Sequence, residues 1–154
     1  MIKTELEQLA RTIAEKHSLP PDVVCGMLER EDNDNPWAVR YEPGFLARYV
    51  MPQYREGKLD ITETYCRAMS WGPLQVMGQT ARELGFEGKY LPELCDPPVG
   101  IEYGCRKLDA CVKNHPGDIN GALEAYNGGS NPNYAGEVLM LSIPYRVEPK
   151  GQQV

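Results

Sequence analysis

The chain has 154 residues, a length typical of one globular domain that buries its core without metals or disulfides. Hydrophobic residues make up 42% and charged residues 25%, which excludes an intrinsically disordered chain. No stretch approaches the roughly 18 consecutive apolar residues of a membrane span. The 16 basic and 22 acidic side chains give a net charge of −6, the wrong sign for binding nucleic acid through its phosphates. We therefore expect one domain, 1–154 with a polar tail at about 149–154, that neither binds nucleic acid nor spans a membrane.

Helical periodicity is the main structural signal along the chain. Apolar residues recur at intervals of three and four in several segments, whereas the alternation typical of strands is scarce. Thr4 and Glu7 form a capping-box pattern at the start of the first segment, and Pro73 suits the first turn of another. The predicted long helices cover about 5–17, 20–31, 73–84, 97–114 and 118–127. These helices predict a mainly α fold.

The segment between the second and third of these helices is less regular. Residues 32–43 are rich in Asn, Asp and Pro, which predicts a loop held by hydrogen bonds from side chains to the backbone. Two short helices are expected around 45–49 and 61–67, separated by a polar stretch.

One carboxylate interrupts the apolar pattern of the second helix. At about 100° per residue, Glu31 lies within about 20° of Val24 and continues the stripe that includes Leu28. Glu29 projects to the opposite side and is expected to be solvated. An apolar environment disfavours an ionised carboxyl, which is how proteins keep a general acid protonated near neutral pH. Periodicity alone also fits a Glu31 that frays into solvent or pairs with an arginine such as Arg67.

Four blocks of the sequence carry a shared pattern. Residues 31–39 read EDNDNPWAV, 69–75 read MSWGPLQ, 94–108 contain Asp-Pro followed by spaced glycines and a leucine, and 125–129 read AYNGG. In type and order they resemble the E-S-x-x-N-P-x-A-V, G-A-x-G-L-M-Q, DP..N...G..YL and A-Y-N-A/G-G blocks of the soluble lytic transglycosylase (SLT) family. This family belongs to the lysozyme-like superfamily.

The resemblance implies a lysozyme-like fold of the goose type in one domain. It implies that Glu31 is the catalytic acid, that Gln75 and Tyr126 line the cleft beside it, and that Asn127 shapes the turn that follows. Tyr126 lies on the apolar face of its predicted helix, so its hydroxyl needs a partner, which a neighbouring carboxyl would supply. Asp32 stands where the family usually has Ser and adds a charge beside Glu31.

A long loop insert distinguishes this chain from the family pattern. Residues 40–68 separate the Glu31 block from the Gly-Pro-Leu-Gln block by more than the family's usual few residues. Part of the insert, 40–45, is similar to a stretch of phage-type peptidoglycan muramidases. We expect the insert to cover the substrate groove.

In the mechanism that the resemblance implies, Glu31 protonates the glycosidic oxygen between N-acetylmuramic acid and N-acetylglucosamine. As a carboxylate it then accepts the proton of the muramoyl C6 hydroxyl, which closes onto C1 and leaves a 1,6-anhydro end. Most glycosidases instead use two carboxyl groups. A hydrolytic muramidase that combines Glu31 with Glu42, Asp60 or Glu63 is therefore the nearest alternative.

Two alternatives lie outside enzymology. The acidic, amide-rich segment 31–42 is suggestive of a calcium-binding module, but a calcium loop that starts at Glu31 has Pro36 at the glycine position. A non-catalytic cell-wall protein on the same scaffold is the other. We expect no metal or cofactor, because Cys105, Cys111 and His115 lack the close ligand pairs of a zinc site.

Aromatic side chains are candidates for sugar binding, because the C–H faces of sugars pack on rings. Trp71 is the best placed, beside Ser70 and near Gln75 in the cleft block, and both Ser70 and Trp71 are expected to contact substrate. Trp37 and Tyr134 are further candidates, although Trp37 equally fits a core position under its loop.

The first residues lack the apolar run and cleavage site of an export signal. We therefore expect synthesis in the cytoplasm and action on the bacterial cell wall after release through phage lysis, a virion or a secretion machinery. The expected partner is the peptidoglycan glycan strand, and the chain is expected to be a monomer. Five cysteines cannot all pair within one chain, and we expect them mostly reduced.

Overall fold

The computed structural model describes residues 3–31 and 35–147. The predicted mainly helical fold is confirmed, with a small sheet near the middle of the chain. The longer helices are α1 (Thr4–Lys16), α2 (Pro21–Glu31), α7 (Pro97–Asn114), α8 (Ile119–Asn127) and α9 (Tyr134–Ser142). Short 3-10 helices, Leu91–Cys95 and Ile143–Tyr145, precede α7 and follow α9.

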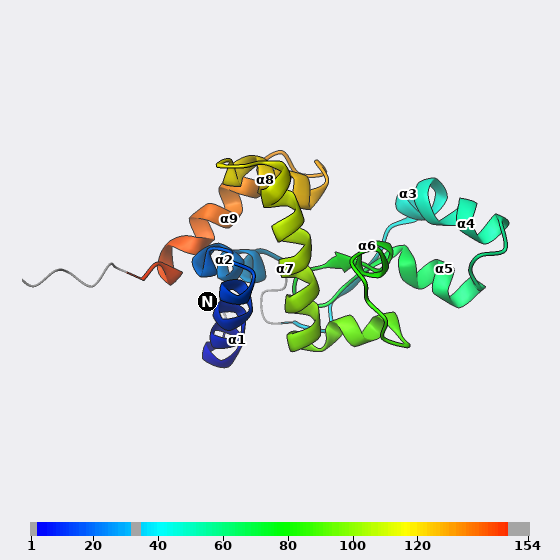
Figure 1. Ribbon diagram of the computed structural model, residues 1–154, viewed down its shortest axis with the longest axis horizontal. Coiled ribbons are helices and arrows are strands. Elements are labelled where there is room, and N and C mark those ends of the chain that lie inside the picture. Colours follow the sequence, from blue (N-terminus) through cyan, green and yellow to red (C-terminus); the bar gives the residue numbers. More distant parts are fainter. Residues whose placement is uncertain (1–2, 32–34, 148–154) are drawn as a thin grey trace, which may run out of the picture.

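The core lies around α2, which packs against α1 and α9, while α7 runs beside them and carries α8 at its far end (Figure 1). Consecutive residues of α2 from Val23 to Leu28 are all buried, because neighbouring helices cover the helix on several sides. Gly26 permits the close approach of α9, since a Cβ there would lie 2.6 Å from the Val138 carbonyl oxygen. Glu31 ends α2 beyond this buried stretch.

The start of α1 differs from the predicted capping box. Lys3 occupies the N-cap position and makes no side-chain cap hydrogen bond, and Thr4 is already the first helical residue. Acidic Glu5 and Glu7 in the first turn favour the helix through its dipole.

The prediction of a helix from Pro73 is wrong, because 69–77 form a β-hairpin. Strands β1 (Val39–Tyr41), β2 (Met69–Trp71) and β3 (Val76–Met77) make an antiparallel sheet in the order β1-β2-β3. Gly72 (φ 69°) and Gln75 (φ 47°) flank the turn in left-handed backbone conformations, which exclude a helix. Helix α6 (Gly78–Glu83) starts only after β3.

The insert, expected as a long loop with short helices around 45–49 and 61–67, is a small helical unit that includes both of these helices. It consists of α3 (Pro43–Phe45), a π-helical turn (Leu46–Val50), α4 (Met51–Arg55) and α5 (Ile61–Arg67). Its own apolar cluster comprises Leu46, Val50 and Ala68, with Phe45, Met51 and Leu59 packed against them. Figure 1 shows α3, α4 and α5 extending to one side, away from α1, α2 and α9.

The five cysteines are free in this structure. Along the described part of the chain, no helix is both long and apolar enough to cross a membrane.

Candidate active site

A cavity of about 470 Å³ lies between α2, the hairpin, the insert, α7 and α8. All four sequence blocks contribute to its lining, although they are far apart along the chain. Five of the six residues proposed for the site line it, namely Glu31, Ser70, Gln75, Tyr126 and Asn127. Glu31 is partly buried at the end of α2, so its carboxyl is accessible from the cavity and still sheltered.

Ser70 and Gln75 fix the shape of the hairpin at the cavity wall. Ser70 Oγ donates to Gln75 Oε1 at 2.8 Å, and Gln75 Nε2 donates to the carbonyl oxygens of Ala38 (3.0 Å) and Gly72 (2.9 Å). These bonds hold Gln75 in a left-handed conformation that is uncommon for a non-glycine residue. Both ends of the Gln75 amide are thus bonded within the protein.

The Tyr126 hydroxyl does not bond to the Glu31 carboxyl, contrary to our expectation. It donates to the Leu74 carbonyl oxygen at 2.7 Å and so ties α8 to the turn of the hairpin. Burial is the main cause that raises the pKa of Tyr126, with Tyr134 and Glu31 adding to it. Tyr126 therefore lines the cavity, while its hydroxyl stabilises the contact between α8 and the hairpin.

Tyr134 is the tyrosine whose hydroxyl lies beside Glu31. Burial and then the nearby Glu31 carboxyl raise the pKa of Tyr134. Within the described residues, the Tyr134 hydroxyl is buried without a hydrogen bond of ordinary geometry. Because Tyr134 is only 1% exposed, a sugar ring cannot stack on it in this structure. The sequence had indicated Tyr134 only as a stacking candidate.

Two contacts hold the Tyr134 ring in place. The ring stacks on Tyr126 with the two centroids 6.4 Å apart and an interplanar angle of 12°. The Arg30 guanidinium lies 5.7 Å from the Tyr134 centroid, and Arg30 is itself fixed by an ion pair of 2.5 Å to Glu137. Asn131 Nδ2 also donates to Glu137 at 3.0 Å. Glu31 therefore lies beside a rigid aromatic pair.

Asn127 shapes the turn after α8, as the resemblance implies for this position. Its amide lies against Ser130 and Asn131, and its oxygen accepts from the Asn131 backbone N–H at 2.7 Å in the orientation that satisfies both ends. Gly128 ends α8 with φ 70°. This turn forms the edge of the cavity next to Tyr126.

The two tryptophans differ in exposure. Trp71 is 6% exposed and its indole N–H donates to the Cys66 carbonyl oxygen at 2.9 Å, so no face is open for a sugar. The adjacent Ser70 points toward the cavity instead, because neighbouring strand residues alternate between faces. Trp37 is 71% exposed, which excludes the core position considered for it and leaves its ring free to stack.

Of the three acids considered as a second carboxylate, Glu42 alone lines the cavity. Asp60 caps α5, where its Oδ1 accepts from the Glu63 backbone N–H at 2.8 Å. Glu63 pairs with Arg67 and Arg82, each with an N–O distance of 2.8 Å. Burial opposes ionisation of Glu63, but the hydrogen bonds from Arg82 and Arg67 outweigh it and lower its pKa.

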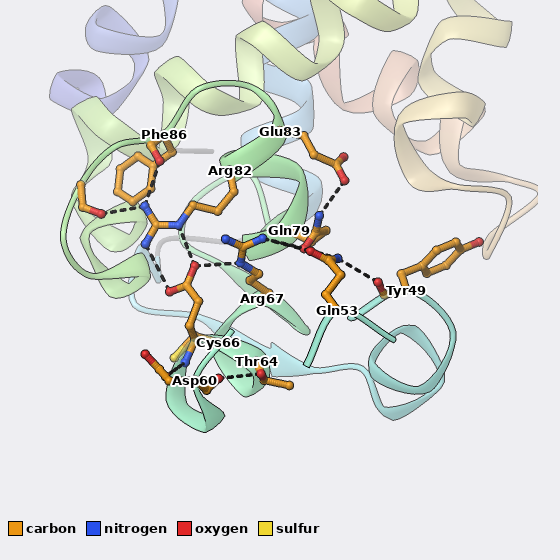
Figure 2. Close-up of polar contacts among 12 residues, drawn as sticks. Tyr49, Gln53, Asp60, Thr64, Cys66, Arg67, Gln79, Arg82, Glu83 and Phe86 are labelled. Carbon is orange, nitrogen blue, oxygen red and sulfur yellow. Dashed lines mark hydrogen bonds and ion pairs between the residues drawn. The ribbon is translucent and has the colours of Figure 1, made fainter. Parts of the chain in front are cut away.

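Figure 2 shows the polar cluster to which Arg67 and Arg82 belong. Arg67 also bonds to Gln79 at 3.2 Å, and Gln53 of the insert donates to the same Gln79 oxygen at 3.2 Å. The cluster joins α4, α5 and α6. Arg67 is therefore committed to holding the insert and is not the partner of Glu31 that periodicity allowed.

The insert contributes one wall of the cavity through Glu42, Phe45 and Tyr49. The rings of Phe45 and Tyr49 contact each other with centroids 4.8 Å apart, and Tyr49 is 49% exposed. We expected from the sequence that the insert would cover the groove, but the sequence did not indicate that Phe45 and Tyr49 would line it. Their apolar character alone does not separate a cavity wall from a core.

The sequence also led to expectations for Glu29 and Asp32, two other acidic residues close to Glu31 in the chain. Glu29 is not simply solvated, because the Tyr145 hydroxyl donates to its carboxylate at 2.5 Å. Asp32, which we expected to place a second charge beside Glu31, lies outside the described residues. Across residues 3–31 and 35–147, no group of three or more His, Cys, Asp or Glu side chains is placed to hold a metal ion.

A comparison with known protein families identifies the family to which this cavity and its lining residues belong. The family model described as "Transglycosylase SLT domain" matches residues 8–136, from α1 to the first turn of α9. No curated protein and no solved structure matches the chain. The match covers more than half of the chain and includes all five of the proposed residues that line the cavity. It supports a lysozyme-like fold and, in general terms, a function on peptidoglycan. The chain belongs to the transglycosylase SLT domain family.

Proposed function

We propose that this protein is a lytic transglycosylase that cleaves the β-1,4 bond between N-acetylmuramic acid and N-acetylglucosamine, with Glu31 as its single general acid and base. The observation that carries the proposal is the position of Glu31 at the wall of the cavity, beside the Ser70–Gln75 pair and Tyr126. Membership of the SLT family points to peptidoglycan as the substrate.

In the first step, Glu31 donates its proton to the glycosidic oxygen. The bond from muramoyl C1 to this oxygen breaks, the N-acetylglucosamine side leaves as an alcohol, and positive charge develops on the muramoyl ring. The partly buried position of Glu31 suits an acid that must be protonated at this moment. The Tyr134 hydroxyl beside it has a donor available for the carboxylate that forms.

In the second step, the Glu31 carboxylate accepts the proton of the muramoyl C6 hydroxyl. The C6 oxygen then bonds to C1, which closes the 1,6-anhydro ring and returns Glu31 to its acid form. No water is consumed, so one carboxyl group suffices for both proton transfers. The engagement of Asp60 and Glu63 in the insert is consistent with this single-carboxylate scheme.

Hydrolysis with Glu42 as base is the second candidate, because Glu42 lines the same cavity as Glu31. Among the described lining residues, these two are the only carboxylates. In this alternative Glu42 activates a water molecule that attacks C1. The two candidates therefore differ in whether an oxygen atom from water enters the product.

Digestion of purified peptidoglycan in water enriched in oxygen-18 separates the candidates. We expect muropeptides without the label, and Glu42→Gln should give the same products at a similar rate. Labelled reducing ends that disappear in Glu42→Gln would replace the proposal with the hydrolytic mechanism. Glu87→Gln, a change of the same type at an exposed position, is the matched control.

A further inference from the structure

Lys107 contributes a positive charge to the cavity that the scheme above does not use. It lies on the side of α7 that faces α8, and its Nζ is 4.0 Å from the centroid of the Tyr126 ring. The side chain is partly buried and lines the cavity together with Glu31. Within the described part of the chain, its ammonium forms no ion pair and lies over the ring of Tyr126.

Arg40 of the insert also lines this cavity but is exposed, and the other basic residues of α7 are placed differently. On the same helix, Lys113 pairs with Asp109 at 2.5 Å and Arg106 pairs with Glu102 at 2.7 Å. Lys113 is also highly exposed, with 73% of its side chain accessible. Among the basic residues of α7, Lys107 is therefore the sheltered one: it faces the cavity and forms no ion pair with a described residue.

Sheltering this ammonium has an electrostatic cost. Burial lowers the pKa of Lys107, whereas Cys111 and Glu31 act in the opposite direction. A charged group removed from water is stable only where an opposite charge or hydrogen-bond acceptors replace the lost hydration. The face of the Tyr126 ring offsets part of this cost through a cation–π contact.

Glu31 cannot serve as the counter-ion at the start of the reaction. To donate a proton to the glycosidic oxygen, Glu31 must be a neutral acid. Glu42, the other carboxylate of the described lining, belongs to the insert wall and is not paired with Lys107. An anionic group of the bound substrate would therefore meet an ammonium whose three donors are available.

We propose that Lys107 binds a carboxylate of the muramoyl residue held next to Glu31 and so makes the cavity selective for glycans that carry this group. The inference rests on the proposed function, because it takes the muramoyl glycan as substrate. N-acetylmuramic acid differs from N-acetylglucosamine by a lactyl ether, whose carboxyl is free in peptide-free strands. A hydrogen bond between charged partners is about twice as strong as one between neutral groups. Lys107 therefore favours a free carboxylate over a neutral amide at this position.

Binding is best measured in a Glu31→Gln background, because Gln stops turnover and imitates the neutral acid. The two probes are a peptide-free hexasaccharide of alternating N-acetylglucosamine and N-acetylmuramic acid and a hexamer of N-acetylglucosamine. Adding Lys107→Met should weaken binding of the muramoyl hexasaccharide about tenfold or more. Binding of the uncharged hexamer should change by less than about twofold.

Matched variants guard against a purely structural effect. Lys113→Met removes an exposed lysine from the same helix and should leave both affinities unchanged. Lys107→Arg keeps the charge and should retain most of the preference for the muramoyl probe, which loss of packing alone would not predict. Thermal unfolding of each variant shows whether it is folded at the temperature of the titration.

Two results would overturn the inference. Equal weakening for both probes would mean that Lys107 contacts a neutral oxygen common to all N-acetylated sugars or supports the fold. Unchanged affinity for both would mean that Lys107 does not contact the sugar. Either result leaves the proposed function standing if the wild-type protein releases anhydro fragments, so the two failures are distinguishable.

Discussion

The Tyr134 hydroxyl is buried beside the carboxyl of Glu31, whereas the Tyr126 hydroxyl is bonded to the Leu74 carbonyl oxygen. The rings of the two tyrosines stack on each other. The hydroxyl of Tyr134 therefore lies beside the proposed acid, whereas the hydroxyl of Tyr126 stabilises the fold. This division of roles predicts opposite outcomes for the same chemical change at the two positions.

Tyr134→Phe should reduce turnover with little effect on stability. The Tyr134 hydroxyl has no hydrogen bond of ordinary geometry to the described residues, so its loss should change the free energy of unfolding by less than about 1 kcal/mol. If it assists the Glu31 carboxylate, kcat should fall about tenfold while KM is nearly unchanged. Initial rates of peptidoglycan solubilisation with denaturant unfolding measure both. Unchanged kcat would remove Tyr134 from the mechanism.

Tyr126→Phe should act mainly on stability. The change leaves the buried Leu74 carbonyl without its 2.7 Å partner, which costs about 1 to 3 kcal/mol of unfolding free energy. Denaturant unfolding at neutral pH gives this value directly. A stable variant with a large loss of turnover would place the Tyr126 hydroxyl in the reaction instead.

Gln75→Gly and Gln75→Ala separate backbone strain from side-chain hydrogen bonds. Both variants lose the bonds to Ser70, Ala38 and Gly72, but glycine adopts the φ of 47° without strain. Gln75→Gly should therefore be more stable than Gln75→Ala by about 1 kcal/mol, and both should be less stable than the wild type. Equal unfolding midpoints for Gly and Ala would show that the backbone conformation at this position carries no cost.

Glu63 should make the insert sensitive to acid. Its pKa is lowered below the ordinary value of 4.5, so the stability that it contributes is present above that value and is lost as pH falls through the folded-state pKa. The stability difference between wild type and Glu63→Gln should therefore be largest near neutral pH and shrink below about pH 4. Unfolding midpoints measured across this range test the trend. A difference that is constant with pH would mean that Glu63 acts through packing, and Glu87→Gln serves as the exposed control.

The helices were largely predictable because their apolar residues repeat at helical spacing over many turns. The prediction from 20 to 31 agrees with α2 (Pro21–Glu31), and the segment that ends before His115 agrees with α7 (Pro97–Asn114). The hairpin at 69–77 was not predictable in this way. Its strands span only two or three residues, and the left-handed φ of Gln75 is supported by a hydrogen bond to Ala38, which is distant in the sequence.

The candidate site was predictable where sequence blocks carry a family pattern, and much less so elsewhere. Glu31, Ser70, Gln75 and Asn127 all line the cavity, but Trp71 is buried because the strand turns alternate residues to opposite faces. Which of two nearby tyrosines faces Glu31 depends on how α8 and α9 pack, and spacing along the chain does not specify it. Spacing along the chain also does not specify that Glu63 pairs with Arg67 of α5 and Arg82 of α6.

The proposed role of Glu31 is tested most directly by the masses of soluble fragments that wild type and Glu31→Gln release from purified peptidoglycan. The proposal predicts muropeptides that are one water lighter than hydrolytic products, and their absence in a Glu31→Gln variant with an unchanged melting temperature. Fragments of the same mass and yield from Glu31→Gln would contradict it, because the chemistry would then not depend on this carboxyl.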